Sequence, residues 1–203
     1  LAEVAAQAGL QLTLGERVRK VAFKADAFQL KLASGTELRA RTVIGAFGKR
    51  SALDRMLDRP FFQERSPFIG VKYHLRAEFP ADLVGVYHFE GGYCGLSRVE
   101  GEDRVNLCYL GRREQLRAHG SLEALEAATL QQQPQPARFL AAAEPLFERP
   151  MVINEVSFAP KAPVVHHLLM AGDAAGLITP ICGNGMAMAI QGGHWAAEHV
   201  TAL

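Results

Sequence analysis

The residues best suited to chemistry lie in one stretch, LLMAGDAAGLITPICGNGMAMAIQGG, at positions 168–193. An apolar strand is expected to end at Gly172, which places Asp173 at its carboxyl end, where open α/β sheets bind ligands. Pro180 then interrupts the chain. Gly183-Asn184-Gly185 opens a helix of small residues, whose free N–H groups and dipole attract negative charge. Because glycine lacks a Cβ, a flat ligand could approach this backbone closely.

The elements around this stretch indicate a mixed α/β chain. Alternating apolar and polar residues predict strands, and helical spacing of apolar residues predicts helices. Pro60 and Pro67 mark a change to a strand-rich region with one wet face, typical of an antiparallel sheet. We expect strands at 10–14, 18–23, 28–32, 36–40, 41–47, 68–79, 82–89, 92–99, 104–110, 151–158 and 164–171, and helices at 1–9, 116–133, 136–147 and from 183 onward.

The segment AGDAAGLITPICGNGMAMAI resembles the second flavin-binding motif of FAD-dependent oxidoreductases with the p-hydroxybenzoate hydroxylase fold. Its Gly-Asp, Pro and Gly-x-Gly spacing is closest to the geranylgeranyl reductase branch. In that family the aspartate binds the ribityl chain of FAD, and the proline and the helix start line the isoalloxazine ring and the pyrophosphate. Backbone N–H groups there stabilise the anionic edge of reduced flavin. The resemblance implies FAD as cofactor, bound by Gly172, Asp173, Pro180, Gly183, Asn184, Gly185 and Met186.

Two further matches and two departures concern the rest of the chain. Ala46-Phe47-Gly48-Lys49-Arg50-Ser51 is similar to the family's Ala-x-Gly-x-x-Ser strand end, which implies a cofactor contact at Gly48. By the same analogy, the backbone of Val18 would contact the adenine of FAD. In the substrate domain, Gly91-Gly92-Tyr93 is similar to a hairpin of the reductases. Phe47 stands where the hydroxylases have aspartate, which weakens the case for an aromatic hydroxylase. The N-terminal Gly-x-Gly-x-x-Gly motif does not occur in these 203 residues.

The resemblance implies a fold and a function. The fold is a partial FAD-binding, Rossmann-like domain with an inserted antiparallel-sheet substrate domain. Residues 1–59 would form the first part of the FAD-binding domain, 60–150 the substrate domain and 151–203 the second part. The enzyme would take hydride from NAD(P)H, or electrons from another donor, and would act on an apolar small molecule. Reductase and monooxygenase both stay open, and the alternative is a ligand-binding module without turnover or an inactive fragment.

Composition excludes several other classes of protein. The chain has 22 Lys and Arg against 21 Asp and Glu, so no net charge favours nucleic acid. No apolar run approaches the roughly 18 residues of a membrane span, although peripheral membrane contact stays open. Three widely spaced cysteines do not suggest a disulfide framework and favour a reducing, cytoplasmic setting. Metal-ligand spacing is absent, so we expect no metal site, and no side chain is assigned as a catalytic acid or base.

Each candidate residue also has a simpler interpretation. Gly172-Asp173 taken alone is compatible with a plain turn, and Gly48 with an exposed basic turn. Val18 suits a strand core equally well, and Cys182 suits packing better than redox chemistry. The aromatic residues of the expected sheet could line an apolar substrate pocket or belong to the core. They are Tyr73, Tyr87, Phe89, Tyr93 and Tyr109.

The first expected helix starts without a cap and the last lacks a stop signal, so the sequence reads as a fragment. With the adenine side of the cofactor site outside these residues, FAD affinity should fall by several decades. We therefore expect the isolated chain to purify colourless, without redox turnover, and poorly soluble or self-associated.

Overall fold

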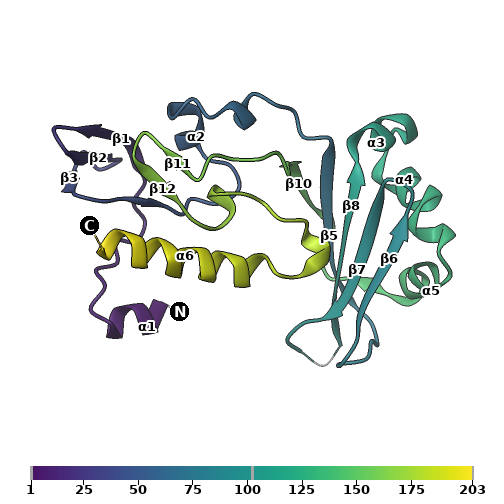
Figure 1. Cartoon of the computed structure of the whole chain (residues 1–203). Helices are drawn as coiled ribbons and strands as arrows, with labels where there is room; N and C mark the ends of the chain where they lie inside the picture. Colours follow the sequence, from purple (N-terminus) through teal and green to yellow (C-terminus); the bar gives the residue numbers. More distant parts are fainter. Residues whose placement is uncertain (1, 102, 203) are drawn as a thin grey trace. The chain divides into compact units, whose positions relative to one another are not determined.

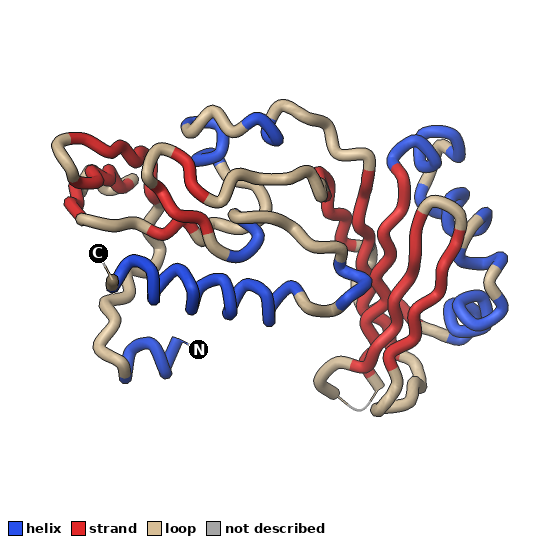
Figure 2. The backbone as a smooth tube through the Cα atoms, in the orientation of Figure 1, coloured by secondary structure: helices blue, strands red, loops and turns tan. Residues whose placement is uncertain are grey.

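The computed structural model describes residues 2–101 and 103–202, and these divide into two compact units (Figure 1). Unit 1 comprises Leu1–Phe62, Pro160–Gly176 and Met186–Leu203. Unit 2 comprises Gln63–Ala159 and Leu177–Gly185. Helices, short strands and several antiparallel sheets are all present, so the expected mixed α/β class is confirmed (Figure 2).

Unit 1 contains two small sheets. One is the antiparallel meander β1-β2-β3, and the other has the order β11-β12-β4, with β12 parallel to β4. A hydrophobic core that includes Phe28, Leu57, Leu168 and Met170 joins them. Its elements are α1 (Ala2–Gln7), β1 (Val18–Lys24), β2 (Ala27–Leu32), β3 (Glu37–Ala40), β4 (Ile44–Gly45), α2 (Ala52–Met56), β11 (Val164–Val165), β12 (Leu168–Met170) and α6 (Gly185–Thr201), with 3-10 turns at Pro60–Phe62 and Gly172–Ala174.

Unit 2 is built on one antiparallel sheet of order β10-β5-β8-β7-β6, with β9 also paired to β5. Figure 2 shows its long strands beside a group of short helices. Its elements are β5 (Phe68–Arg76), β6 (Val84–Phe89), β7 (Gly92–Arg98), β8 (Arg104–Arg112), α3 (Arg113–His119), α4 (Leu122–Ala128), α5 (Pro134–Ala142), β9 (Glu144–Pro145) and β10 (Met151–Val156), with 3-10 turns at Leu130–Gln132 and Pro180–Cys182.

The two faces of the unit 2 sheet differ. On one face, strand residues such as Leu75 and Leu107 pack with Leu125 of α4 in the main core. We call the opposite side the open face. Side chains alternate along a strand, so every second cross-strand pair faces the core and the pairs in between face the open side. They include Lys72 opposite Cys108, His74 opposite Asn106, and Tyr93 opposite Leu110.

Some local predictions were wrong. Residues 10–14 form no strand, and Leu10, Leu12 and Leu14 are exposed, because their alternating pattern meets no partner strand. The strand expected at 164–171 is a hairpin instead, turned by two histidines with positive φ, His166 (48°) and His167 (68°). The helix expected at 116–133 breaks where Gly120 takes a left-handed conformation (φ 82°).

Candidate functional site

The centre of the site in unit 1 is a pair of parallel strands, β4 and β12. Ile44 lies opposite Leu169 and Gly45 opposite Met170, and the Ala171 N–H donates to the Gly45 carbonyl oxygen at 3.0 Å. Parallel strands end at the same edge of a sheet, so the chain leaves both strands on the same side. The loops that carry Gly48 and Asp173 therefore begin from one sheet edge.

Gly172 and Asp173 form the turn after β12. Gly172 has φ +59°, and a Cβ built on it would lie 3.2 Å from the Cβ of Ala189 in α6, so both the backbone and the packing favour glycine. Asp173 is half-buried, and its carboxylate makes no hydrogen bond to any residue that the structure describes. A half-buried carboxylate without a donor can accept hydrogen bonds from a ligand.

Lys161 connects the two loops. Its Nζ donates to the carbonyl oxygen of Lys49 at 2.7 Å and to that of Asp173 at 2.8 Å. The same ammonium lies 4.3 Å from the centre of the Phe61 ring. Burial lowers the pKa of Lys161 below its ordinary value, while the nearby carboxylates of Asp54 and Asp173 act in the opposite sense. One side chain thus holds the backbone of both strand-end loops.

A buried arginine holds the next residue of the turn. Arg59 donates to the Asp54 carboxylate at 2.9 Å, to the Ala174 carbonyl oxygen at 2.8 Å and to the Ala162 carbonyl oxygen at 2.9 Å. Both charged side chains are 1% exposed. Asp54 in turn accepts from the Ser51 N–H as part of the capping box of α2. The turn after β12 is therefore fixed from α2 and its flanking loop.

The sequence patterns did not identify Lys161 or Arg59 as residues of the site. The segment Pro160-Lys161-Ala162-Pro163 carries one usable signal, because the flanking prolines favour extended backbone around a lone lysine. The sequence around Arg59 carries no such signal, because its partner Ala174 is 115 residues away.

The predicted residues at 180–186 lie around the start of α6. Pro180 begins a 3-10 turn that Gly183 ends with φ +66°. Asn184, Gly185 and Met186 are exposed, and Met186 exposes 81% of its surface. Gly185 has no positive φ, and a Cβ placed on it would meet nothing within 4 Å. The chain itself therefore does not require glycine at this position.

The same segment reaches the open face of the unit 2 sheet. Just before Pro180, the Thr179 side chain lies near Tyr93 of β7. Burial raises the pKa of Tyr93, and the nearby Cys108 and Cys182 thiols act in the same direction. Cys182 is exposed and Cys108 half-buried, and both are free thiols. These side chains place the segment 177–185 against one end of the open face.

Gly48 and Val18 are the remaining predicted contacts. Gly48 follows β4 with φ +82°, and a Cβ placed on it would meet nothing within 4 Å. Val18 is the first residue of β1, half-buried and paired with Leu32. The structure is compatible at Gly48 with a cofactor contact or a plain turn, and at Val18 with a cofactor contact or a strand core. A cofactor contact at either residue therefore stays a prediction.

Of the two interpretations made from the sequence for the five aromatic residues, pocket or core, the structure shows core for four. Tyr73 and Tyr109 donate to the Glu126 carboxylate of α4 at 2.7 and 2.9 Å, on the helix-covered side of the sheet. Tyr87 and Phe89 pack against the same core, and only Tyr93 lies on the open face. The physical reason is that residues two apart in a strand share one face of the sheet, and only one of the two faces packs against the core.

No helix in the described residues is long and apolar enough to cross a membrane. They also contain no group of three or more His, Cys, Asp or Glu side chains that could hold a metal ion.

The fold is similar to that of known flavoproteins. A flavoprotein/dehydrogenase from Cytophaga hutchinsonii has a TM-score of 0.76 and 18% identity, over 99% of this chain and 52% of that one. P. aeruginosa PqsL in complex with 2-aminobenzoylacetate has a TM-score of 0.66 and 26% identity, over 93% and 53% of the two chains. The halogenase PltM in complex with phloroglucinol and FAD has a TM-score of 0.70 and 12% identity, over 93% and 42%.

Comparisons of the sequence with protein-family models and with curated proteins find no match. The solved structures nevertheless confirm the fold that the motif at 171–190 implied. The chain spans about half, or less, of the length of the three proteins, and it has the fold of the FAD-dependent oxidoreductase superfamily.

Proposed function

We propose that the protein is an FAD-dependent oxidoreductase acting on an apolar small molecule, and that residues 172–173 and 180–186 bind the cofactor. The observation that carries this proposal is the Asp173 carboxylate. Among the residues that the structure describes it has no hydrogen-bond donor, and it lies at the carboxyl end of a parallel strand pair, where ligands bind in open α/β sheets. The fold that surrounds it is similar to that of one flavoprotein over 99% of the chain and to that of PltM, solved with FAD, over 93%.

The residues around the start of α6 fit such a cofactor. Gly185 is neither strained nor crowded, so a molecule lying against the backbone would explain glycine there better than the chain does. The 17 residues of α6 give a helix dipole whose positive end lies at Gly185. The first N–H groups of the helix can therefore donate to an anionic group.

Bound FAD would supply the redox chemistry, while the chain binds, orients and stabilises charge. Asp173 would accept hydrogen bonds from hydroxyl groups of the ribityl chain. The first N–H groups of α6 would stabilise negative charge on the flavin edge. Lys161 and Arg59 would fix the turn that carries Asp173, since both donate to its backbone carbonyls at 2.8 Å.

Unit 1 would belong to the FAD-binding domain and unit 2 to the substrate domain. The sequence assigned 1–59 and 151–203 to the FAD-binding domain and 60–150 to the substrate domain, but β10 pairs with β5, so residues 151–159 would extend the substrate domain. The electron donor would be NAD(P)H or another small carrier. A reductase would turn over without oxygen and a monooxygenase would require it, so anaerobic turnover with NADPH separates the two.

The test is a titration of the full-length gene product with FAD, followed by flavin fluorescence. Asp173→Ala should weaken FAD binding about ten- to a hundred-fold, because hydrogen bonds to a charged acceptor contribute about 1.5–3 kcal/mol. Asp82→Ala, at an exposed loop position, serves as the matched control and should leave the affinity unchanged. A folded Asp173→Ala protein with wild-type affinity would overturn the assignment.

A further inference from the structure

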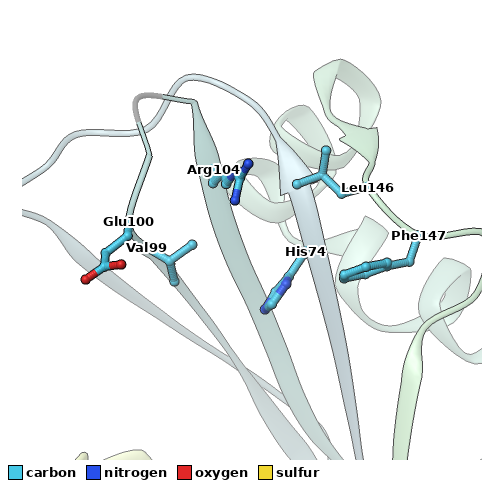
Figure 3. A pocket seen from close by; sticks show the side chains of 6 residues that line it. All are labelled: His74, Val99, Glu100, Arg104, Leu146 and Phe147. Atoms are coloured by element: carbon cyan, nitrogen blue, oxygen red, sulfur yellow. The ribbon is translucent and has the colours of Figure 1, made fainter.

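Unit 2 contains a second feature suited to a ligand, a pocket of about 490 Å³ on the open face of its sheet (Figure 3). Its lining residues come from β5, β8, the hairpin after β7 and the loop after β9. They are His74, Val99, Glu100, Arg104, Leu146 and Phe147. This volume lies within the range of about 300–1,000 Å³ that is typical of small-molecule sites.

The wall of the pocket is aromatic and apolar. The rings of His74 and Phe147 lie 5.5 Å apart, centre to centre, at 40° to each other. Phe147 exposes 54% of its surface, a large value for an aromatic ring, and Val99 exposes 38%. A flat apolar molecule would cover this surface by stacking on the Phe147 ring.

One polar group of the pocket is the Arg104 guanidinium, which has no partner among the described residues. Arg76, opposite Arg104 on the neighbouring strand, is paired with Asp103 at 2.9 Å and Glu144 at 3.5 Å. Arg104 makes no hydrogen bond or ion pair through its side chain to the residues that the structure describes. Figure 3 shows the Glu100 carboxylate pointing away from the rings and from Arg104. Within the described part of the chain, the pocket therefore offers the Arg104 cation beside an aromatic wall.

We propose that this pocket binds a planar aromatic molecule that carries a carboxylate. The ring would lie against Phe147 and His74, and the carboxylate would pair with the Arg104 guanidinium, which matches carboxylate geometry through two parallel N–H donors. An apolar ring alone would leave the guanidinium unused, and a small inorganic anion would leave the Phe147 ring uncovered.

The pocket is separate from the cofactor segment along the sheet. Tyr93, in β7, lies near Thr179 of the cofactor segment. Val99, which lines the pocket, directly follows β7 and is six residues further along the chain. At about 3.3 Å per residue this separation is roughly 20 Å. This site lies outside the proposed cofactor site, and binding to it is measured without flavin. Ligand binding here is therefore independent of whether FAD binds.

The experiment compares naphthalene-2-carboxylate with its neutral analogue naphthalene-2-carboxamide, each titrated into the flavin-free protein and followed by calorimetry. We expect the carboxylate to bind about tenfold more tightly, because its contact with Arg104 is charge-assisted. Arg104→Gln should remove this preference, and Arg104→Lys should retain part of it. Phe147→Ala should weaken both probes by a similar factor, since it removes the ring contact.

Arg112→Gln is the matched control, an exposed arginine at the other end of β8 that pairs only with Glu114 among the described residues. It should leave both affinities unchanged. Three results would each overturn the proposal. They are equal affinity of the two probes for the wild type, a carboxylate preference that survives in Arg104→Gln, and no binding of either probe at millimolar concentration. A thermal unfolding curve for each variant confirms that it is folded.

Discussion

Lys161 is the residue that does most to hold the turn proposed to bind flavin. It donates to one carbonyl oxygen in the loop after β4 and to another in the turn after β12. Because it bonds backbone atoms, its effect on a ligand is indirect, through the position of Asp173. Lys161 is therefore a positioning residue, and its loss should affect both stability and flavin affinity.

Lys161→Met keeps the length of the side chain and removes its three donors. We expect the free energy of unfolding to fall by about 1–3 kcal/mol, because two half-buried carbonyl oxygens lose a charged donor. FAD affinity should fall about tenfold, and Lys161→Arg should restore part of it. Urea unfolding and flavin titration measure the two effects, with exposed Lys20→Met as the control. Wild-type values of both in Lys161→Met would refute the role.

At the scale of elements, the glycines of β7 are not equivalent. A Cβ on Gly92 would collide with the Leu110 carbonyl oxygen, a backbone atom of the paired strand. A Cβ on Gly95 would lie 3.9 Å from the Cys108 carbonyl oxygen, which is an ordinary contact. The close approach of β7 to β8 therefore depends on glycine at the first position only.

Gly92→Ala should lower the free energy of unfolding by about 1–3 kcal/mol, because the strands must move apart to admit the methyl group. Gly95→Ala should change it by less than about 0.5 kcal/mol. Urea denaturation of the two variants measures the difference directly. Equal destabilisation by both substitutions would mean that the strand spacing at Gly92 is not as described.

The hydrogen-bonded group formed by Tyr73, Tyr109 and Glu126 joins α4 to the sheet. Burial, aided by the Glu126 carboxylate, raises the pKa of both tyrosines above the ordinary value of 10.0. Burial also raises the pKa of the Cys94 thiol, to about 12. All three groups are therefore held neutral in the folded protein at pH values where the unfolded chain loses their protons.

Stability should consequently fall in alkaline solution. A folded-state pKa above the unfolded value gives a contribution that is complete below the unfolded pKa and is lost as pH rises through the folded pKa. The loss should begin near pH 8.5 for the thiol and near pH 10 for the phenols. Urea unfolding at about pH 8 and about pH 11 measures it, and Tyr73→Phe with Tyr109→Phe should reduce the difference. A difference of wild-type size in this double variant would contradict the assignment.

The sequence predicted elements better than it predicted contacts. Strands β2, β5, β7 and β8 follow their alternating patterns, because one face of each meets a core. The pattern at 10–14 is as clear, but no partner strand pairs with it. The tyrosines show a second limit, since alternation indicates that residues share a face without indicating which face the helices cover.

At the scale of the whole molecule, the candidate site depends on pairings that are distant in sequence. Unit 1 is assembled from three separate segments, and the turn after β12 is held by Arg59 across 115 residues. The motif at 171–190 could be recognised because its residues are consecutive. The supports provided by Lys161 and Arg59 could not, because nothing local marks a side chain that bonds a distant carbonyl group.

The proposed function depends most on the binding of flavin by Asp173 in the turn after β12. A crystal structure of the full-length gene product with FAD tests it most directly. We predict an Asp173 carboxylate oxygen within about 2.5–3.0 Å of a ribityl hydroxyl oxygen, the distance of an O–H···O hydrogen bond. FAD bound with Asp173 out of reach of the cofactor, or FAD-saturated crystals without flavin at this turn, would contradict it.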